Sequence, residues 1–439
     1  MASSPLRRGA SILSALTLAS YVTGLARDML LARLLGAGSV LDIYNAAFAV
    51  PDVLLNIFIA GALSAAFIPV FSELLARKQT EEANQLASAM LTWAPITMGA
   101  IASGAYIAMP WLAPLVAPGF SPADQAALIE VSRLMLLSPI IFALSNTLGS
   151  MLVAYDRFVA YGLSPILYNL GIIGGIWLAI DMGPAGLALG TIIGASLHLL
   201  SRLIAVARSG FTPTTAISHA AVHLKRVGRL MLPRMAGQPI EQLTFLLFTN
   251  IASGLGAGSI AILSFARNFQ SVPVALFGIS MSTAIFGSLS RLWATGDRNG
   301  FKRTLKEAFP PLIGVTLLST LFYVFFSGIV VSVFLGSGRF DAAAIATTAS
   351  LLAWFALAIP AESCIHLFVR GFYAIHDTWT PILISVPGLG LIWLLASWLT
   401  PIIGINGLAI AYASAVTIEA LALGGLLYYR VSTTSVSST

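Results

Sequence analysis

The chain has 439 residues, of which 58% are hydrophobic and only 9% are charged, and it carries a formal net charge of +6. Its mean hydropathy of +0.91 lies far above the range of soluble globular proteins, a class that this composition excludes. Apolar windows of about 20 residues recur along the chain, each long enough to cross a bilayer as a helix. The sequence therefore predicts an all-α integral membrane protein, because a helix satisfies its own backbone hydrogen bonds in lipid.

The first apolar segment begins with the basic residues Arg7 and Arg8, as a secretory signal peptide does, but it runs on without a break through residues 20–36. We therefore expect an uncleaved first span. Further apolar segments follow in chain order. The twelve predicted spans are 10–35, 41–75, 83–115, 124–154, 158–180, 184–207, 222–252, 258–292, 304–335, 343–374, 380–400 and 404–429.

Most of the 23 Lys and Arg residues fall at one set of span ends. They include Arg77 and Lys78 after the second span and the group from Arg291 to Lys306 around the start of the ninth. The opposite connections contain only Arg339. The positive-inside rule therefore places both termini in the cytoplasm. The basic loops suit contacts with anionic lipids better than nucleic-acid binding.

The sequence contains no motif for enzymatic chemistry. The single cysteine, Cys364, excludes an intramolecular disulfide and a cysteine metal cluster. No zinc-protease, P-loop or nucleophile-elbow pattern occurs. We therefore expect no enzymatic activity, no catalytic residue, no bound metal and no organic cofactor.

The second half of the chain resembles the first at an offset of about 220 residues. Matched pairs are Gly38 and Gly258, Pro139 and Pro360, and Ala154 and Ala374. Internal repeats of this kind occur in transporters whose two bundles surround a central cleft. Because each half has an even number of spans, we expect two six-helix bundles, residues 1–212 and 213–439, related by an axis along the membrane normal.

Polar residues form a stripe on the predicted second span. The stripe consists of Asp42, Asn45, Asp52 and Asn56. At 100° per residue, these four positions cover an arc of about 80° on the helix surface. On the first span, Arg27 and Asp28 are adjacent and therefore point about 100° apart. We expect that they do not simply neutralise each other and that Arg27 approaches Asp42 or Asp52.

The second half places its polar residues on the corresponding two spans. They are Arg234, Gln238, Glu241 and Gln242, followed by Arg267 and Gln270. A charge at mid-membrane costs about 2.5 to 3.5 kcal/mol on insertion scales, so such groups face a wet cavity or one another. We predict that both sets line a water-accessible central cleft and bind substrate. Hydrogen bonding between helices is the alternative role for any one of them.

Other polar residues stand apart from these sets. Glu130 and Arg133, three residues apart on the fourth span, predict a local ion pair near the outer surface. His198, His366 and Glu419 occur singly on late spans of their halves. For these three we expect packing or capping at least as readily as a functional role.

Three stretches together indicate a family. They are the run from Gly24 to Leu75, which begins GLARDMLLARLLGAGSVLD, the segment VAPGF at 116–120, and the segment RGFYAIHDTWTP at 370–381. Over nearly its whole length the chain resembles the MurJ (MviN) family of lipid II flippases, within the multidrug, oligosaccharidyl-lipid and polysaccharide exporter superfamily.

The resemblance implies two six-helix bundles around a V-shaped central cavity in a bacterial inner membrane. Such a protein moves an undecaprenyl-pyrophosphate-linked peptidoglycan precursor from the cytoplasmic to the outer leaflet by alternating access, without chemistry. The resemblance also implies that cationic cavity residues bind the anionic head group. Arg27 matches the arginine of the GLARD motif, and Asp42 matches the acidic residue after the GAG turn.

The sequence departs from the family where other members carry cavity charges. Leu55 and Asn56 stand where an arginine pair is common, and Tyr21 stands where a basic residue is expected. The charged cluster of the eighth span is reduced to Arg267, Asn268, Gln270 and Ser271. We therefore expect head-group binding to depend on Arg27, Arg267 and Arg234, supported by amide donors. The two additional C-terminal helices of longer members are expected to be missing, as in a short, divergent member.

Three functions remain open from the sequence. The first is a lipid II flippase, with other lipid-linked oligosaccharides as alternative cargo. Its partners would be a polyprenyl-linked glycan, membrane lipids and cell-wall synthesis proteins, with no nucleic acid, and either membrane potential or a coupling ion, H⁺ or Na⁺, would drive it. The second is a cation-coupled exporter of small organic cations with the same fold. The third is a non-transporting scaffold for envelope assembly.

Overall fold

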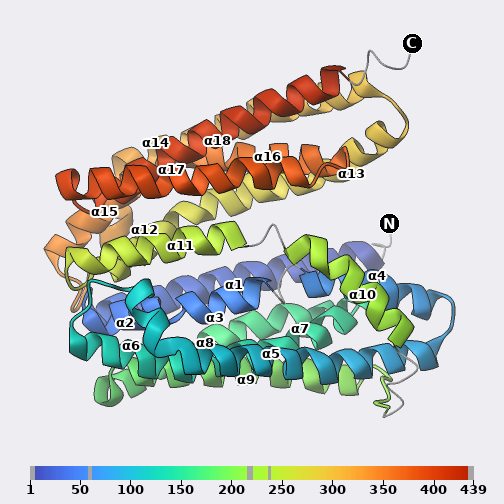
Figure 1. The fold of residues 1–439 in the computed structure, drawn as a ribbon, viewed down its shortest axis with the longest axis horizontal. Helices are drawn as coiled ribbons and strands as arrows, with labels where there is room; N and C mark the ends of the chain where they lie inside the picture. Colours follow the sequence, from blue (N-terminus) through green and yellow to red (C-terminus); the bar gives the residue numbers. More distant parts are fainter. Residues whose placement is uncertain (1–4, 58–61, 215–220, 236–238, 434–439) are drawn as a thin grey trace. The chain divides into compact units, whose positions relative to one another are not determined.

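The computed structural model describes residues 5–57, 62–214, 221–235 and 239–433. Every regular element in these ranges is helical, which confirms the predicted all-α fold class. The chain divides into two compact units, residues 1–250 and 251–439 (Figure 1). The predicted boundary at residue 212 marks the start of the second sequence repeat and stays a prediction.

The first unit contains α1 to α11. Their bounds are α1 (Pro5–Leu35), α2 (Ser39–Ala47), α3 (Ala49–Leu55), α4 (Ala62–Ala76), α5 (Thr80–Val116), α6 (Pro122–Met135), α7 (Leu137–Ala154), α8 (Phe158–Met182), α9 (Pro184–Ala207), α10 (Ala221–Met235) and α11 (Pro239–Ala252). A buried apolar core joins α4, α5, α7 and α10 through Phe67, Phe71, Leu86, Met151 and Val227. On the other side of the unit, α8 packs between α9 and α1.

The second unit contains α12 to α18. Their bounds are α12 (Ser259–Pro273), α13 (Ser280–Ala294), α14 (Arg298–Phe334), α15 (Ala342–Ala356), α16 (Ile359–Ala374), α17 (Trp379–Ile403) and α18 (Asn406–Thr433), with the short 3₁₀ turn η3 (Ser253–Leu255) before them. The buried side chains of Leu289, Phe301, Phe372 and Leu427 form a core shared by α13, α14, α16 and α18.

Eight described stretches of helix are long and apolar enough to cross a membrane. They are Thr80–Val116, Pro122–Ala154, Phe158–Met182, Pro184–Ala207, Ser259–Ala294, Arg298–Phe334, Trp379–Ile403 and Asn406–Thr433. A ninth is counted if α15 and α16, which are bent by 43° relative to each other, form one broken span. The chain is therefore a multi-pass membrane protein, and the total of twelve spans stays a prediction.

Prolines break the helices beside the predicted polar residues. Pro51 has no N–H to donate to the carbonyl of Ala47, and the chain turns at Phe48, between α2 and α3. In the second unit, Pro273 ends α12, and a π-helical segment, η4 (Val274–Ile279), follows it. Such segments are rare and occur frequently at functional sites.

The internal repeat is visible in the turns between helices. Asp156, between α7 and α8, and His376, between α16 and α17, are 220 positions apart and share left-handed φ angles of 58° and 62°. Gly183 and Gly404, which precede α9 and α18, have φ angles of 57° and 64°. Positive φ angles are uncommon for residues with side chains. Equivalent connections of the two halves thus share a backbone conformation, as the repeat predicts.

Glycines hold α8 and α9 at very short range. A Cβ atom built on Gly171 would lie 2.2 Å from the Cα atom of Gly194, and one built on Gly190 would lie 2.4 Å from the Cα atom of Gly175. Small residues let helices approach closely in membranes, where van der Waals packing drives their association. In this helix pair, the side of α8 that faces away from α9 packs against α1. The α8–α9 contact therefore fixes the position of the site between α1 and α8.

Gly171→Ala is expected to destabilise the first unit, because the added methyl group overlaps the backbone of α9. Overpacking of this kind costs about 1 to 3 kcal/mol. Gly174→Ala in the same helix is the matched control, since nothing lies within 4 Å of its Cβ position. Thermal unfolding in detergent should show a lower midpoint for the first variant only. Equal midpoints would contradict the tight α8–α9 contact.

Asp377 connects the turn between α16 and α17 to the end of α18. Its carboxylate accepts hydrogen bonds from the Thr380 amide at 3.0 Å and from the Thr380 hydroxyl at 2.6 Å. The guanidinium of Arg430 lies 3.7 Å away. Burial alone raises the pKa of this carboxyl, but the bonds from Thr380 and the charge of Arg430 hold the pKa of Asp377 below its ordinary value.

The charge of Asp377 is expected to stabilise the fold in a pH-dependent way. Because its pKa is lower in the folded chain, the stabilisation is present above the ordinary aspartate pKa of about 3.9 and is lost as the pH falls through the depressed pKa. Asp377→Asn should lower the free energy of unfolding near neutral pH by about 1 kcal/mol, a typical value for a helix-capping side chain. The difference from wild type should disappear in acid.

Unfolding curves across this pH range measure the effect. Glu307→Gln is the control, since its ion pair with Arg303 is 3.9 Å long and exposed, and exposed pairs contribute little. A destabilisation by Asp377→Asn that stays constant at every pH would show that the charge is not responsible.

Candidate functional site

Arg27 on α1 pairs with its own neighbour. Its Nε and Nη2 atoms lie 2.9 and 2.8 Å from Oδ1 of Asp28, to which both donate. The prediction that these adjacent residues cannot neutralise each other is wrong, because the long arginine side chain curls back across the angle of about 100° that separates their Cβ directions. Their side chains are 24% and 13% exposed, so the pair is largely buried and keeps a small exposed surface.

Asn169 on α8 completes this cluster. Nη1 of Arg27 donates to its Oδ1 atom at 2.9 Å, and its Nδ2 atom donates to the carbonyl of Ser20 at 3.3 Å. The predicted approach of Arg27 to Asp42 or Asp52 is therefore wrong: among the described residues, its hydrogen-bond partners are Asp28 and Asn169. The Asn169 amide both orients the guanidinium and connects α8 to α1.

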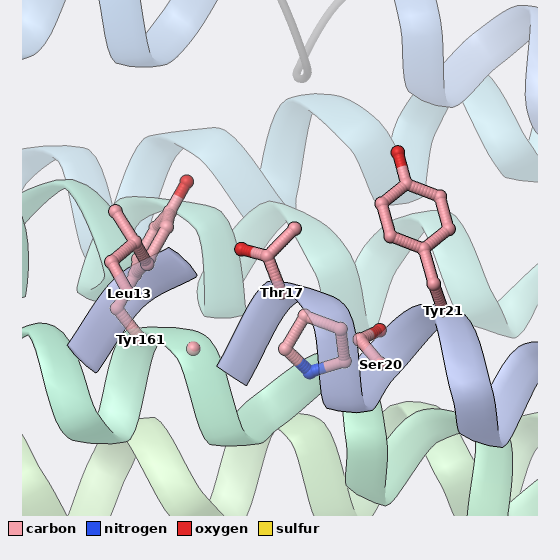
Figure 2. Close-up of a pocket in the computed structure, with 7 residues that line it drawn as sticks. Leu13, Thr17, Ser20, Tyr21 and Tyr161 are labelled. Carbon is pink, nitrogen blue, oxygen red and sulfur yellow. The ribbon is translucent and has the colours of Figure 1, made fainter. Parts of the chain in front are cut away.

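A pocket of about 230 Å³ lies between α1 and α8, beside this cluster (Figure 2). Its lining residues are Leu13, Thr17, Ser20 and Tyr21 of α1 and Tyr161, Gly162 and Pro165 of α8. Figure 2 shows Thr17 and Tyr21, one helical turn apart, projecting to the same side of α1. Hydroxyl groups both donate and accept hydrogen bonds, so this pocket can contact a polar, hydroxyl-rich group while Arg27 contacts an anion nearby.

The predicted stripe on the second span is split between α2 and α3. Asp42 is buried in the first turn of α2, with 2% exposure, whereas Asn45 and Asp52 are half-buried. Asn56 donates to the carbonyl of Asp52 at 3.0 Å, so its amide is used within its own helix. Phe48, the residue between these two helices, keeps α-helical dihedral angles of φ −71° and ψ −23°. The common face of these residues and their role as ligands stay predictions.

In the second unit, Arg267 on α12 forms the corresponding cluster. Its Nη1 atom donates to Oε1 of Gln270 at 2.6 Å, and Nε2 of Gln270 donates to Oε2 of Glu362 on α16 at 2.8 Å. Arg267 and Glu362 are 3.7 Å apart, with side chains 17% and 15% exposed. The guanidinium also lies 4.5 Å from the ring centroid of Tyr412 on α18, at cation–π distance.

The remaining predicted residues surround the start of α11. Glu241 is exposed in the first turn of this helix, and Gln242 is half-buried. Arg234 belongs to α10, but its side chain lies outside the described part of the structure, as does Gln238 altogether. The predicted contribution of these residues to substrate binding is not tested by the structure.

Asn169 and Glu362 were not among the residues predicted from the sequence. Asn169 is a strongly polar residue in the apolar middle of α8. Glu362 begins a set of polar residues spaced four apart on α16, followed by His366 and Arg370. These two patterns were the available signals. Both stand on later helices of their units and hold a cation on an early one.

A second buried arginine in the first unit connects helices through hydrogen bonds. Arg202 on α9 is 4% exposed and donates to the Ser164 hydroxyl at 2.8 Å, the Ser145 carbonyl at 2.9 Å and the Asn146 side chain at 3.0 Å. His198 contacts the Ser145 hydroxyl at 2.7 Å. These bonds connect α7, α8 and α9, in agreement with the packing role expected for His198.

Glu362→Ala is expected to destabilise the second unit, because it leaves the charge of Arg267 without its carboxylate in a largely buried position. Removing one partner of a buried pair costs about 3 to 5 kcal/mol, and the remaining exposure favours the lower end. In thermal unfolding, the double variant Arg267→Met, Glu362→Ala should lose less stability than the two single losses added together. Strict additivity would contradict a coupling between these residues.

Comparison with known proteins shows which family this chain belongs to. The family model described as "Lipid II flippase MurJ" matches residues 31–437. The lipid II flippase MurJ of Burkholderia cenocepacia is 28% identical over 430 residues, which cover 95% of this chain and 83% of that protein. The probable lipid II flippase MurJ of Treponema pallidum is 25% identical over 432 residues, which cover 96% of this chain and 81% of that protein.

Solved structures agree with these matches. A structure of "Lipid II flippase MurJ, inward closed conformation" aligns with a TM-score of 0.80 and 25% identity, covering 95% of this chain and 87% of that one. An inward-facing multidrug resistance MATE transporter of the MOP superfamily aligns with a TM-score of 0.78 at 15% identity, covering 98% and 100%, and shows the shared fold. The chain belongs to the lipid II flippase MurJ family.

Proposed function

We propose that this protein moves lipid II, a polyprenyl-pyrophosphate-linked peptidoglycan precursor, from the cytoplasmic to the outer leaflet of a bacterial inner membrane. Membership of the MurJ family over nearly the whole chain is the observation that carries this proposal. Movement between leaflets needs no covalent step, so the protein acts as a transporter in peptidoglycan synthesis and not as an enzyme. Both termini lie in the cytoplasm in this proposal, as the distribution of Lys and Arg predicts.

The head group carries its negative charge on the pyrophosphate, and we assign its binding to Arg27 and Arg267. Each guanidinium is partly exposed, and arginine binds phosphate in a bidentate, charge-assisted manner. The pyrophosphate must displace Asp28 from Arg27 and Glu362 from Arg267, because these carboxylates contact the guanidinium groups in the absence of substrate. Such an exchange keeps the cations neutralised before and after substrate binds.

The pocket between α1 and α8 supports a head group larger than phosphate. Its hydroxyl-bearing side chains are those of Thr17, Ser20 and Tyr21. Thr17 and Tyr21 lie within about one turn of Ser20, and the Ser20 carbonyl accepts a hydrogen bond from Asn169, the partner of Arg27 on α8. We assign this pocket to a polar part of the head group, such as sugar hydroxyls or peptide amides. The prenyl tail stays in lipid, where it needs no polar contact.

Alternating access in this proposal is driven by membrane potential or by H⁺ or Na⁺ bound at an acidic residue, with no organic cofactor. One charge moved across 100 mV gains about 2.3 kcal/mol. The candidates for ion binding are Asp42 and Asp52 on the second span and Glu241 in the first turn of α11. A second function, cation-coupled export of organic cations, is favoured by the likeness to the MATE fold, and it would use these same acidic residues.

Arg27→Ala is expected to abolish or greatly reduce transport without loss of folding. Charge-assisted hydrogen bonds are worth about 1.5 to 3 kcal/mol, so head-group affinity should fall about tenfold or more. The measurement is lipid II accessibility at the cell surface in cells depleted of their own flippase, at matched membrane levels of each variant. Arg303→Ala, which removes an exposed arginine of the second unit, is the control.

Two further variants test whether the orientation and the geometry of the Arg27 guanidinium matter for transport. Asn169→Ala should give intermediate transport, because it removes the bond that orients Arg27 without removing the cation. Arg27→Lys should keep part of the activity, since it keeps charge but loses bidentate geometry. Normal transport by the correctly inserted Arg27→Ala variant would contradict the assignment. If the wild type moves no lipid II, other lipid-linked glycans and organic cations become the substrates to test.

A further inference from the structure

A groove on the surface of the first unit is separate from both cation clusters. It measures about 730 Å³ and lies between α5, α6 and α7, with Ala185 at the start of α9 at one end. Most of its lining is apolar, and Ile107, Ile129 and Leu137 contribute to its walls. The charged residues in it are Glu130 and Arg133, both on α6.

Arg133 does not form the predicted ion pair with Glu130. Its Nε atom donates to the carbonyl of Tyr106 on α5 at 3.1 Å, and its guanidinium lies 4.6 Å from the ring centroid of Tyr106. These contacts hold the cation against the groove wall. Among the described residues, no hydrogen bond or ion pair engages the Nη atoms of Arg133 or the carboxylate of Glu130. The structure therefore presents one cation and one anion side by side, each available to a ligand.

The depth of Arg133 in the bilayer explains why it needs an anion. Trp93 and Trp111 on α5 are 52% and 70% exposed, and tryptophan is enriched at both membrane interfaces, so we take these two residues to mark them. The segment between them is about 27 Å long, close to the thickness of the hydrocarbon core. Tyr106, on which Arg133 is stacked, therefore lies about 7 Å inside the interface marked by Trp111. A cation at that depth is stabilised by an anionic partner, and the phosphate of an adjacent lipid can supply one to the Nη atoms.

We propose that this groove binds a zwitterionic glycerophospholipid with a primary amine in its head group. The phosphate contacts the Nη atoms of Arg133, the ammonium group contacts Glu130, and one acyl chain occupies the apolar groove along Ile107, Ile129 and Leu137. Charge complementarity selects this lipid class, because a head group with only negative charge would face the carboxylate of Glu130. Volumes of about 300 to 1,000 Å³ are typical of sites that enclose small ligands, and this groove falls in that range.

The site follows from the geometry of α5, α6 and α7 and is independent of the proposed transport function. By the predicted topology, it faces the outer leaflet, since the loop between α5 and α6 is one of the connections that lack Lys and Arg. Its test therefore measures lipid binding directly, without any readout of lipid II movement.

The experiment is native mass spectrometry of the delipidated full chain in detergent, with phosphatidylethanolamine and phosphatidylglycerol of identical acyl chains. The wild type should retain phosphatidylethanolamine in preference to phosphatidylglycerol. Arg133→Gln should lower phosphatidylethanolamine retention about tenfold, the effect of losing a charge-assisted hydrogen bond. Glu130→Gln should keep total phospholipid binding but remove the preference. Arg303→Gln is the charge-matched control and should change neither quantity.

A variant that leaves both charges in place tests the groove itself. Ala126 lines it and is exposed, so Ala126→Phe fills the groove without entering the core and should also lower retention. Thermal unfolding of each variant confirms that it is folded. Unchanged retention by folded Arg133→Gln and Ala126→Phe, or equal binding of the two lipids by the wild type, would overturn the proposal.

Discussion

The structure depends on one constraint: a charge inside a membrane protein must be neutralised wherever water does not reach it. In each unit a partly buried arginine is held by a carboxylate and an amide. Arg27 is held by Asp28 and Asn169, and Arg267 by Gln270 and Glu362. An isolated charge at these positions would destabilise the helices that carry it. Each of these cations is therefore folded together with its own carboxylate.

The two halves share the backbone conformation of their helix connections but not the positions of their buried arginines. Left-handed turns recur at equivalent positions, at Asp156 and His376 and again at Gly183 and Gly404, because the connection between two antiparallel helices fixes the backbone at that point. The arginines instead stand on different elements: α1 in the first unit and α12, the counterpart of the second predicted span, in the other. Duplication thus provided the helices, and the polar residues diverged separately in each copy.

The sequence predicted the elements and the charged residues better than their pairing. Hydrophobic periodicity located the helices, since it is a local property. Partners on distant helices depend on packing, so Asn169 and Glu362 were missed although both are polar residues within predicted spans. Asp28 was rejected as a partner of Arg27 because helical phase describes Cβ directions, whereas a long side chain can reach past its own phase. Helical phase also predicted an ion pair between Glu130 and Arg133, but the Arg133 side chain extends to Tyr106 on α5 instead.

In the proposed mechanism, the two clusters differ in the consequence of displacing the carboxylate from its arginine. Asp28 is adjacent to Arg27 on α1, so breaking that pair needs only side-chain rotation and leaves α1 attached to α8 through Asn169. Glu362 stands on α16, so displacing it from Arg267 weakens the polar connection between α12 and α16. Next to that connection, η4 interrupts regular helix after Pro273, and a Cβ atom on Gly278 would lie 2.9 Å from the Cα atom of Ser363 on α16. In the proposed mechanism, binding at Arg27 leaves the contact between α1 and α8 in place, whereas binding at Arg267 acts on the contact between α12 and α16, next to the π-helical segment η4. That mechanism therefore couples substrate binding to helix movement most directly in the second unit.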